Sequence, residues 1–427
     1  MHSTPSASVV ATPVTASALR LAADETLDQG LDELIRAAAR RALAAALETE
    51  VSQYIAAHAH LRDERGRRLV SRNGRLPRRA VQSPLGPLEV HQPRISDRRR
   101  DESGQRIRFT SRVLPKYLRK TKAVEELVPW LYLKGVSSND FSEALSALGL
   151  GCAAGFSPNS VGRMKEHWRQ EWFEWSRRSL AGKRYAYLWA DGIYFNIRLG
   201  DAGRQCVLVL MGANEEGGKE LVALTDGHRE STQSWLEVLR ELKERGLECS
   251  PRLAVGDGSL GFWKALAEVY PDCRQQRCWV HKTANVLAHL PRTRQSSAKA
   301  DLHQVWMAGT AAEAGAAFDS FLRIYRTQFP KAVACLEKDR EELLAFYRFP
   351  AEHWPHVRTT NPIESTFATV RLRTAKTKGS GTREACLSLA FKLCQSAQKK
   401  WRPLNAPGLV ADVDAGVEFE DGTRKAA

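Results

Sequence analysis

The chain has 427 residues, of which 43% are hydrophobic and 26% charged, a composition that fits a folded protein of several domains and excludes a disordered or fibrous chain. Lys and Arg outnumber Asp and Glu by 64 to 49, so the formal net charge is +15, and this excess indicates a polyanionic partner. No apolar run is long enough to span a bilayer, and the first residues lack the basic start and apolar core of a secretory signal. We therefore expect no membrane partner. The eight cysteines show no disulfide-scaffold spacing, which favours a reducing cytoplasm as the location of the protein.

The first part of the chain combines a helix with a dense basic segment. Residues 1–25 are rich in Ser, Thr, Ala and Pro and are predicted to form a disordered lead. From Leu27 to Ala57, apolar residues recur at helical spacing, which predicts a long amphipathic helix for packing or for a dimer contact. Residues 61–120 then hold 18 Lys and Arg against 6 Asp and Glu, and their Gly and Pro residues favour loops and short strands. Four arginines are candidates for DNA phosphate contacts, although a basic segment can also be a solvated face: Arg72, Arg75, Arg78 and Arg79.

Residues 121–175 read as helix, turn, helix, loop, helix. Gly135-Val136-Ser137 forms the predicted turn, and Ser157-Pro158 has the residue types of a helix start. Such a unit suits a helix-turn-helix reader of the major groove, although three-helix units without a DNA role also exist. The sequence therefore predicts a helical and basic DNA-binding region over residues 26–180, with a helix-turn-helix-like part at 121–175.

A single carboxylate stands within the strand-like run from Tyr185 to Ile197. Because side chains alternate along a strand, Asp191 shares one face with large apolar groups such as Trp189 and Phe195. A buried ionised carboxylate needs a hydrogen-bond donor or a cation. Asp191 is therefore a candidate ligand or catalytic acid, and the alternative is a solvated acid at a kink next to Gly192.

Three strand-like runs separated by Gly-containing turns predict an antiparallel meander: Tyr185 to Leu199, Gln205 to Gly212 and Lys219 to Thr225. A helix, a strand ending at Gly256-Asp257-Gly258, a second helix and a short strand complete residues 181–282. This order is that of a ribonuclease-H-like core, so the predicted fold class is α+β, with a helical and basic N-terminal region before a mixed-sheet core that carries an all-α insertion. In such a core the fourth strand pairs beside the first, which places Asp257 near Asp191.

The rest of the chain is predicted to be mostly helical. Residues 283–357 form an all-helical insertion, residues 358–402 contain a returning helix that starts near Glu364 and a second basic patch, and residues 403–427 form an acidic loose tail. Residues 371–402 hold 9 Lys and Arg against 1 acidic residue, and the combined excess of the two basic segments exceeds the net charge of the chain. Further candidate DNA contacts lie in and before this patch: Arg358, Lys376 and Lys378.

Two aspartates at neighbouring strand ends and a glutamate from a returning helix can hold two divalent cations for displacement at phosphorus. Oxygen ligands suit Mg²⁺, with Mn²⁺ as a substitute. The alternatives are a turn role for Asp257 and a capping role for Glu364, with Asn361 as cap and Pro362 first in the helix. Cys278 and His281 look like half of a zinc site, but the ligand count favours a packing or positioning role near the active site.

Several motifs together resemble the prokaryotic Mutator-type insertion-sequence transposases, which are DDE enzymes. The resemblance spans about residues 31–393, and the residues that carry it are Arg72-Asn73-Gly74, Pro93-Arg94, Gly135-Val136-Ser137, Asp191-Gly192, Arg245-Gly246-Leu247, Asp257-Gly258, Gln276-Arg277-Cys278-Trp279-Val280-His281 and Thr359-Thr360-Asn361-Pro362-Ile363-Glu364. It implies that Asp191, Asp257 and Glu364 are the catalytic carboxylates. The segment Ser365-Thr366-Phe367 departs from the Asn- and Arg-rich version of the family.

The resemblance implies a Mg²⁺-dependent DNA transposase that binds the terminal inverted repeats of its element, cleaves a strand and transfers it to target DNA. The implied partners are double-stranded DNA and further copies of the chain, as a homodimer or higher oligomer, in a bacterial cytoplasm near the nucleoid. Two alternatives stay open: a ribonuclease-H-like nuclease, and a catalytically dead DNA-binding regulator derived from a transposase.

Overall fold

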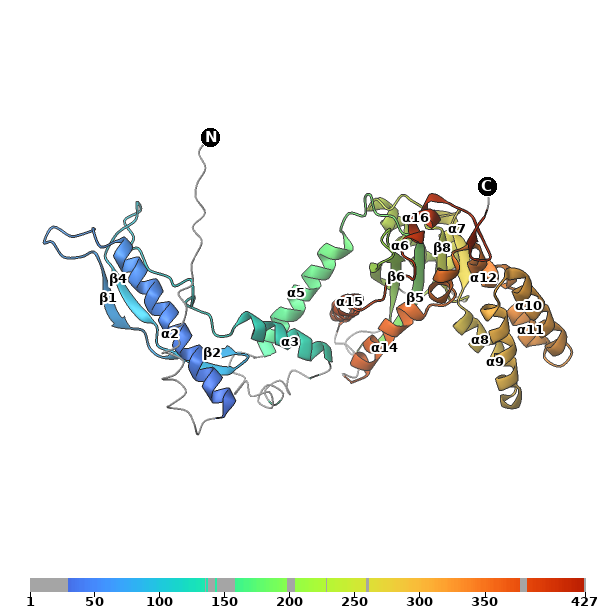
Figure 1. The fold of residues 1–427 in the computed structure, drawn as a ribbon, viewed down its shortest axis with the longest axis horizontal. Helices are drawn as coiled ribbons and strands as arrows, with labels where there is room; N and C mark the ends of the chain where they lie inside the picture. The colour runs from blue at the N-terminus through green and yellow to red at the C-terminus, as the bar shows by residue number, and fades with distance from the viewer. Residues whose placement is uncertain are drawn as a thin grey trace. The chain divides into compact units, whose positions relative to one another are not determined.

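The computed structural model describes residues 30–134, 136, 143, 158–197, 204–227, 229–258, 261–376 and 382–425 (Figure 1). The chain divides into two compact units, residues 1–161 and residues 162–427. No helix within the described ranges is both long and apolar enough to cross a bilayer.

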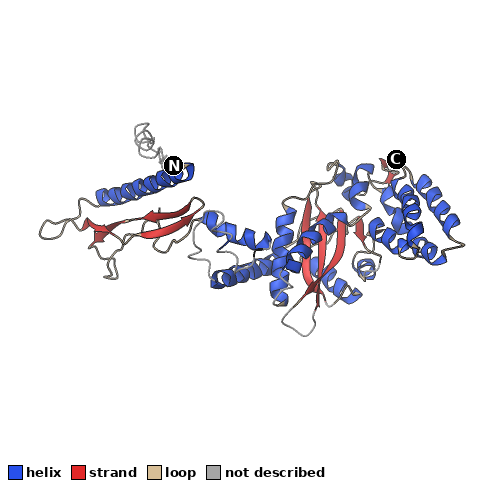
Figure 2. Ribbon diagram, turned by 90° about the horizontal axis from the view of Figure 1, so that it is seen from below, coloured by secondary structure: helices blue, strands red, loops and turns tan. Residues whose placement is uncertain are grey.

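The first unit combines helices with two small antiparallel sheets. Its elements are α2 (Leu31–Ala57), β1 (Val70–Arg75), β2 (Arg79–Ser83), β3 (Gly86–Val90), β4 (Pro93–Asp97) and α3 (Lys122–Lys134). Strand β1 pairs with β4 and β2 pairs with β3, while α2 lies along the strands (Figure 2). Leu47 of α2 closes a small core with Val81, Val90 and Leu114. The predicted long helix is confirmed, and the basic segment that follows it forms the short strands β1 to β4, as its Gly and Pro residues indicated.

The two units meet at residue 161, whereas the sequence placed a boundary at residue 180, so α5 (Pro158–Ser176) lies largely in the second unit. Trp172 donates its indole N–H to the Leu224 carbonyl at 3.0 Å, and Arg178 just beyond α5 donates to the Leu221 carbonyl at 2.9 Å. These donors satisfy carbonyls of an edge strand and so attach the helix to the sheet. The first and last helices of the predicted helix-turn-helix-like part correspond to α3 and α5, whereas Gly135, Ser137 and the helix expected at 141–148, apart from Glu143, fall outside the described residues.

A mixed five-stranded sheet forms the centre of the second unit. Its strands are β5 (Tyr187–Asn196), β6 (Arg204–Ala213), β7 (Lys219–Gly227), β8 (Leu253–Gly256) and β9 (Arg274–Arg277), in the order β7-β6-β5-β8-β9. The first three strands form an antiparallel meander, and β8 and β9 join β5 in parallel. The predicted meander and the pairing of the fourth strand beside the first are confirmed, and the fold is α+β.

Side chains of β5 alternate between two buried faces of the sheet. Leu188 and Ala190 face a core that contains Trp235 of α6 (Thr232–Glu244) and Phe262 of α7 (Phe262–Val269). On the other face, the Tyr187 hydroxyl meets Nδ1 of His353 at 2.7 Å and the Trp189 indole donates to the His356 carbonyl at 3.0 Å. Helices therefore cover both faces, and the face shared by Tyr187, Trp189 and Asp191 is the one that the returning chain covers.

The predicted all-helical insertion is confirmed, and it packs as a group of helices beside the β8–β9 edge (Figure 1). Its elements are α8 (Trp279–Leu287), α9 (Arg292–Met307), α10 (Ala311–Tyr325), α11 (Pro330–Glu337), α12 (Arg340–Leu344), η1 (Ala345–Arg348), η2 (Ala351–His353) and α13 (Trp354–Val357). The chain then returns to the sheet as α14 (Asn361–Lys376) and α15 (Arg383–Gln398), which pack on β5 and β7.

The predicted loose tail is wrong. Residues 403–425 contain α16 (Leu409–Ala415), β10 (Phe419–Glu420) and β11 (Thr423–Arg424), and Val410, Val413 and Phe419 are buried. Arg252 donates to the Asp414 carbonyl at 2.6 Å, and Arg184 pairs with the Asp414 carboxylate at 2.5 Å. The acidic composition gave no sign of this short helix, whose apolar face is buried and whose Asp414 is held by Arg184 and Arg252.

Gly246, in the turn after α6, gives a test of this packing. Its φ is +101°, and a Cβ atom there would lie 2.8 Å from the backbone nitrogen of Ala181. Gly182 also has a positive φ, +76°, but nothing lies within 4 Å of its Cβ position. Left-handed backbone costs a non-glycine residue about 1 to 2 kcal/mol, so Gly182→Ala should lose about that much stability. Gly246→Ala should lose clearly more stability, because its Cβ atom would also clash with the Ala181 backbone. Urea midpoints measure both losses, and equal losses would show that the contact with Ala181 has no effect.

Candidate active site

Asp191 and Asp257 each come one residue after a position at which β5 and β8 are paired in the central sheet. Ala190 of β5 is the register partner of Gly256 of β8, so the next residue on each strand is one of the two aspartates. Asp191 is 9% exposed and accepts a hydrogen bond from the Gly192 N–H at 2.8 Å. The backbone of Asp257 is held by the Trp263 indole, which donates to its carbonyl at 2.7 Å. Two carboxylates distant in sequence thus lie on adjacent strands, Asp191 within β5 and Asp257 just after the end of β8.

Glu364 reaches the site from the first turn of α14, which packs on β5. Its Oε1 accepts a hydrogen bond from the Thr360 hydroxyl and lies 3.6 Å from Nδ1 of His281. No hydrogen bond among the described residues joins this carboxylate to a backbone N–H of the helix start. The Asn361 N–H instead faces the Thr359 hydroxyl at 3.4 Å. The capping box that offered a non-catalytic explanation of Glu364 is therefore not formed.

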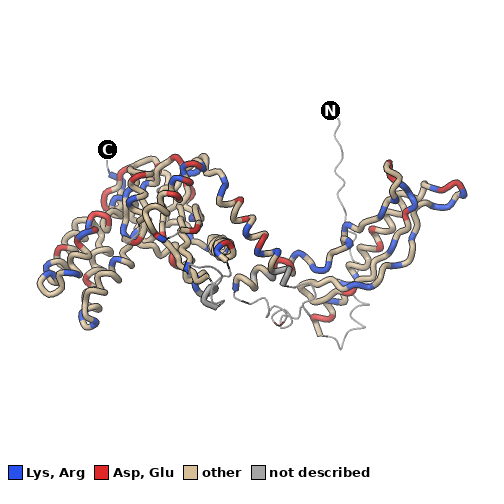
Figure 3. The backbone as a smooth tube through the Cα atoms, turned by 180° about the vertical axis from the view of Figure 1, so that it is seen from behind, with Lys and Arg blue, Asp and Glu red and all other residues tan. Residues whose placement is uncertain are grey.

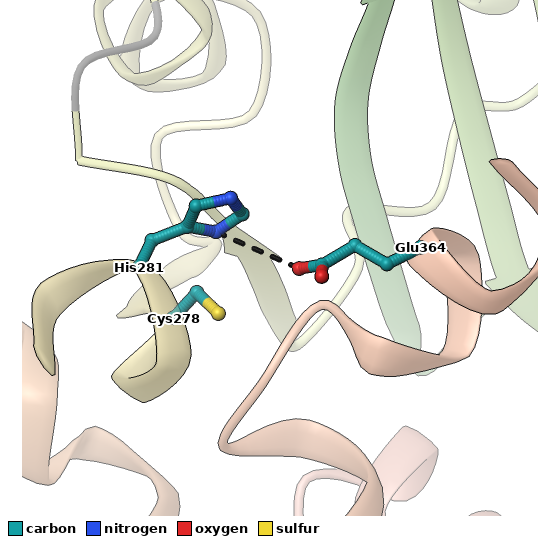
Figure 4. A group of neighbouring side chains, drawn as sticks. All are labelled: Cys278, His281 and Glu364. Carbon is teal, nitrogen blue, oxygen red and sulfur yellow. Dashed lines mark ion pairs between the residues drawn. The ribbon is translucent and has the colours of Figure 1, made fainter. Parts of the chain in front are cut away.

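Cys278 and His281 stand at the start of α8, on the same side as Glu364 (Figure 4). The Cys278 sulfur accepts a hydrogen bond from the Thr360 N–H at 3.3 Å and lies 3.2 Å from the Thr360 hydroxyl oxygen. The Cys278 N–H donates to the Gly256 carbonyl at 2.9 Å, one residue before Asp257. The pair therefore links the end of β8 to the start of α14.

Glu230 is a fourth carboxylate of this region that sequence reasoning missed. It lies just before α6, and its side chain covers Gly192, since a Cβ atom at position 192 would be 2.4 Å from Oε1 of Glu230. Its carbonyl accepts the Gly261 N–H at 3.0 Å, which joins two loops at this edge. The available signal was Gly192 itself, because glycine inside a strand often marks a close approach of another group.

The charges of these residues act on one another. Burial, and then the charges of Glu230 and Glu364, raise the pKa of Asp191 to about 7, although the Gly192 N–H and the charge of His281 oppose the rise. A hydrogen bond with Cys278 is the main cause that raises the pKa of His281 to about 9. Burial raises the pKa of Glu230, and Asp257 acts in the same direction. The side chains therefore share one electrostatic environment in which acids predominate.

This donor set fits a hard divalent cation. Asp191, Glu230, Asp257 and Glu364 offer only carboxylate oxygens, and the like charges that raise the pKa of Asp191 would be offset by a bound cation. Within the described part of the chain, Cys278, His281 and Glu364 form a closer group of potential metal ligands. Their ligand atoms all lie within 4.8 Å of one another. Asp191 and Asp257 lie outside that closer group.

The candidate DNA contacts differ in what they touch within the chain. Lys and Arg recur along the strands of the first unit (Figure 3). Arg72 and Arg75 both pair with Glu48, at 2.8 and 2.5 Å. Arg79 donates to the carbonyls of Lys116 and Pro115 at 2.5 and 2.9 Å, so it holds a loop, whereas Arg78 is exposed.

The candidate DNA contacts of the second unit are Arg358, Lys376 and Lys378. Arg358 donates to the Trp306 carbonyl at 2.9 Å and stacks on the Trp306 ring, so it attaches the helical insertion to the start of α14. The side chain of Lys376 and the whole of Lys378 lie outside the described part of the chain. Their contacts with DNA stay predictions.

The comparisons with known proteins agree in one family. A model of the family described as "Transposase, Mutator family" matches residues 11–403. The chain is 53% identical over 287 residues to the transposase for insertion sequence element IST2 of Acidithiobacillus ferrooxidans, covering 66% of this chain and 94% of that protein. It is 50% identical over 299 residues to the transposase for IS6120 of Mycolicibacterium smegmatis, covering 70% and 92%. The transposase for IS256 in transposon Tn4001 of Staphylococcus aureus is 26% identical over 331 residues, covering 77% and 80%. The chain therefore belongs to the Mutator family of transposases.

Proposed function

We propose that the chain is a DDE transposase with a ribonuclease-H-like core, which binds the terminal inverted repeats of an insertion sequence and catalyses strand cleavage and strand transfer. The observation that supports the proposal is the register Ala190–Gly256, which sets Asp191 of β5 beside the end of β8 and Asp257, together with the packing of α14, the helix that carries Glu364, on β5. Family membership supports the same reaction class.

Asp191, Asp257 and Glu364 are the residues proposed to hold Mg²⁺, with Mn²⁺ as a substitute, and Glu230 lies beside them. Bound divalent cations polarise a phosphodiester and lower the pKa of a bound nucleophile. The chain contributes rigid placement: the sheet holds the two aspartates, and Thr360 and His281 orient the Glu364 carboxylate. In the proposed reaction water attacks a phosphodiester, frees a 3′-OH and leaves a 5′-phosphate on the other side of the break. The 3′-OH then attacks a phosphodiester of the target strand, forms a new phosphodiester and releases a 3′-OH of the target.

The proposal is tested with purified protein, a duplex that carries an element end, and a target plasmid. The inverted repeats are sought in the DNA that flanks the coding region. With Mg²⁺ we expect nicks with 3′-OH ends at the repeat boundary, followed by joined products. Nicking without joining would identify the nuclease alternative. Binding of the ends without any cleavage would identify the regulator alternative.

The basic segment of the first unit is proposed to bind DNA phosphates, and Arg78 and Arg79 form a matched pair for testing this. Arg78→Gln should reduce the slope of log K against log salt by about one, because one phosphate contact is lost, while the urea midpoint stays unchanged. Arg79→Gln should lower the urea midpoint, since the carbonyls of Lys116 and Pro115 lose their donor. Gel-shift titrations and urea unfolding measure the two effects. An unchanged salt slope for Arg78→Gln would mean that this arginine is only solvated.

A further inference from the structure

Glu364 belongs to two sets of potential ligands. One is the carboxylate set with Asp191 and Asp257, and the other is the group that it forms with Cys278 and His281, whose ligand atoms all lie within 4.8 Å of one another. The second set has a different chemistry, because it offers a sulfur, an imidazole nitrogen and one carboxylate oxygen (Figure 4). We propose that Cys278, His281 and Glu364 form a binding site for a thiophilic divalent cation such as Zn²⁺, and that its occupation withdraws Glu364 from the proposed catalytic set. The inhibitory part of this inference rests on the proposed function, and the binding part does not.

The spacing of the three ligand atoms is close to that around zinc. Zn–S and Zn–N or Zn–O bonds of roughly 2.3 and 2.0 Å place the ligand atoms of a tetrahedral site roughly 3.3 to 3.5 Å apart. Nδ1 of His281 and Oε1 of Glu364 are 3.6 Å apart. Side-chain rotations that draw the atoms together by roughly 1 Å would complete three protein ligands, the number found in zinc sites that keep one open position.

The residue at the centre of the group is Thr360, which is fully buried. Its hydroxyl oxygen lies 3.2 Å from the Cys278 sulfur and 3.4 Å from Nδ1 of His281, and it donates to Glu364. One hydroxyl carries a single proton, so it cannot donate to the sulfur and the carboxylate at the same time. A divalent cation bound to all three ligands would satisfy them together, and it would displace the Thr360 hydroxyl from the centre.

The start of α8 holds two of the three proposed ligands, Cys278 and His281, close together. Cys278 is the N-cap residue of α8, and its sulfur accepts the Thr360 N–H at 3.3 Å, which fixes the position of the sulfur. His281 lies three residues further, on the same face of the helix. Magnesium favours oxygen donors, whereas sulfur and imidazole ligands select zinc and related ions, so the two ligand sets discriminate between metals.

The binding part is tested with Co²⁺ in place of Zn²⁺, using the full chain without DNA. We expect one Co²⁺ per chain and a near-ultraviolet charge-transfer band from the thiolate, both competed away by Zn²⁺. Cys278→Ser should remove the band, and Glu364→Gln should weaken binding by more than about tenfold, the loss that even outer partners of metal ligands cause. The matched controls Cys249→Ser and His289→Ala, at exposed positions outside the group, should keep both the band and the affinity. A missing band, a band that survives Cys278→Ser, or an unchanged affinity in Glu364→Gln would overturn the site.

The inhibitory part is tested by adding Zn²⁺ to the Mg²⁺-supported cleavage reaction. Zn²⁺ should inhibit the wild type, and Cys278→Ser should be at least about tenfold less sensitive when each protein is compared with its own rate without Zn²⁺. Equal sensitivity would overturn the inhibitory role. A cobalt band in a protein that does not cleave end DNA would uphold this site and refute the proposed reaction, and cleavage without the band would do the reverse.

Discussion

Replacing Asp191, Asp257 or Glu364 by Ala is expected to abolish strand cleavage while leaving the binding of end DNA intact. Each change removes a proposed cation ligand and leaves the basic segment of residues 61–120 untouched. The loss should be large for every single variant, because members of one catalytic unit are not additive. Gel shifts report binding, and nicking of an end-bearing duplex reports cleavage. Full cleavage by any of the three folded variants would remove that residue from the proposed set.

Glu364→Gln separates catalysis from structure at the third position. The Gln carbonyl oxygen can still accept the hydrogen bond from Thr360, so the start of α14 should keep its stability. It lacks the negative charge that a hard cation requires, so cleavage should still be lost. Metal-stripped wild type should regain activity with Mg²⁺ or Mn²⁺, whereas Ca²⁺ should support binding with little cleavage, because its coordination is looser. A Glu364→Gln protein that cuts as well as the wild type would show that the carboxylate is structural.

Asp191→Asn is expected to raise the stability of the metal-free protein at neutral and alkaline pH. The pKa of Asp191 rises from 3.8 to about 7 in the folded chain, mainly through burial, so the folded state favours the protonated acid. Between those two values the folded state binds more protons than the unfolded state, and the stability of the wild type falls as the pH increases. Above pH 7 the full cost is present, up to about 4 kcal/mol at about 1.4 kcal/mol for each pKa unit. Asn has no proton to lose and avoids this cost.

Urea unfolding at a series of pH values measures the effect. The advantage of Asp191→Asn should grow from about pH 4 to pH 7 and then stay constant. Mg²⁺ should stabilise the wild type but not the variant, because a ligand that binds only the folded state shifts the equilibrium toward it. Asp319 is the control, since its exposed carboxylate pairs with Arg340 and its pKa is lowered, so Asp319→Asn should bring no gain. A wild type as stable as Asp191→Asn at pH 8 without metal would contradict the cost of the buried charge.

Elements with a strong local pattern could be predicted from the sequence. The long helix α2, the antiparallel meander and the helical insertion were expected from the spacing of apolar residues and from turn residues, and the structure contains all three. The adjacency of Asp191 and Asp257 could also be expected, because the order of the strands implied that the fourth pairs beside the first. Of the four strands of the first unit only β3 was foreseen individually, at Leu88 to His91, since short strands with exposed charged side chains have little alternation.

The sequence by itself thus determined the order of the elements in the second unit, the family, and three candidate carboxylates, because helical and strand periodicity and motif spacing are properties of neighbouring residues. Only the tertiary structure decided which side chains meet. It brought Glu230 over Gly192, placed Thr360 between Cys278 and Glu364, attached α5 to the edge of the sheet, and joined the acidic C-terminal segment to Arg184. These contacts join residues far apart in the chain, and they depend on how two sheet faces and several loops close together, which no local pattern of residues encodes.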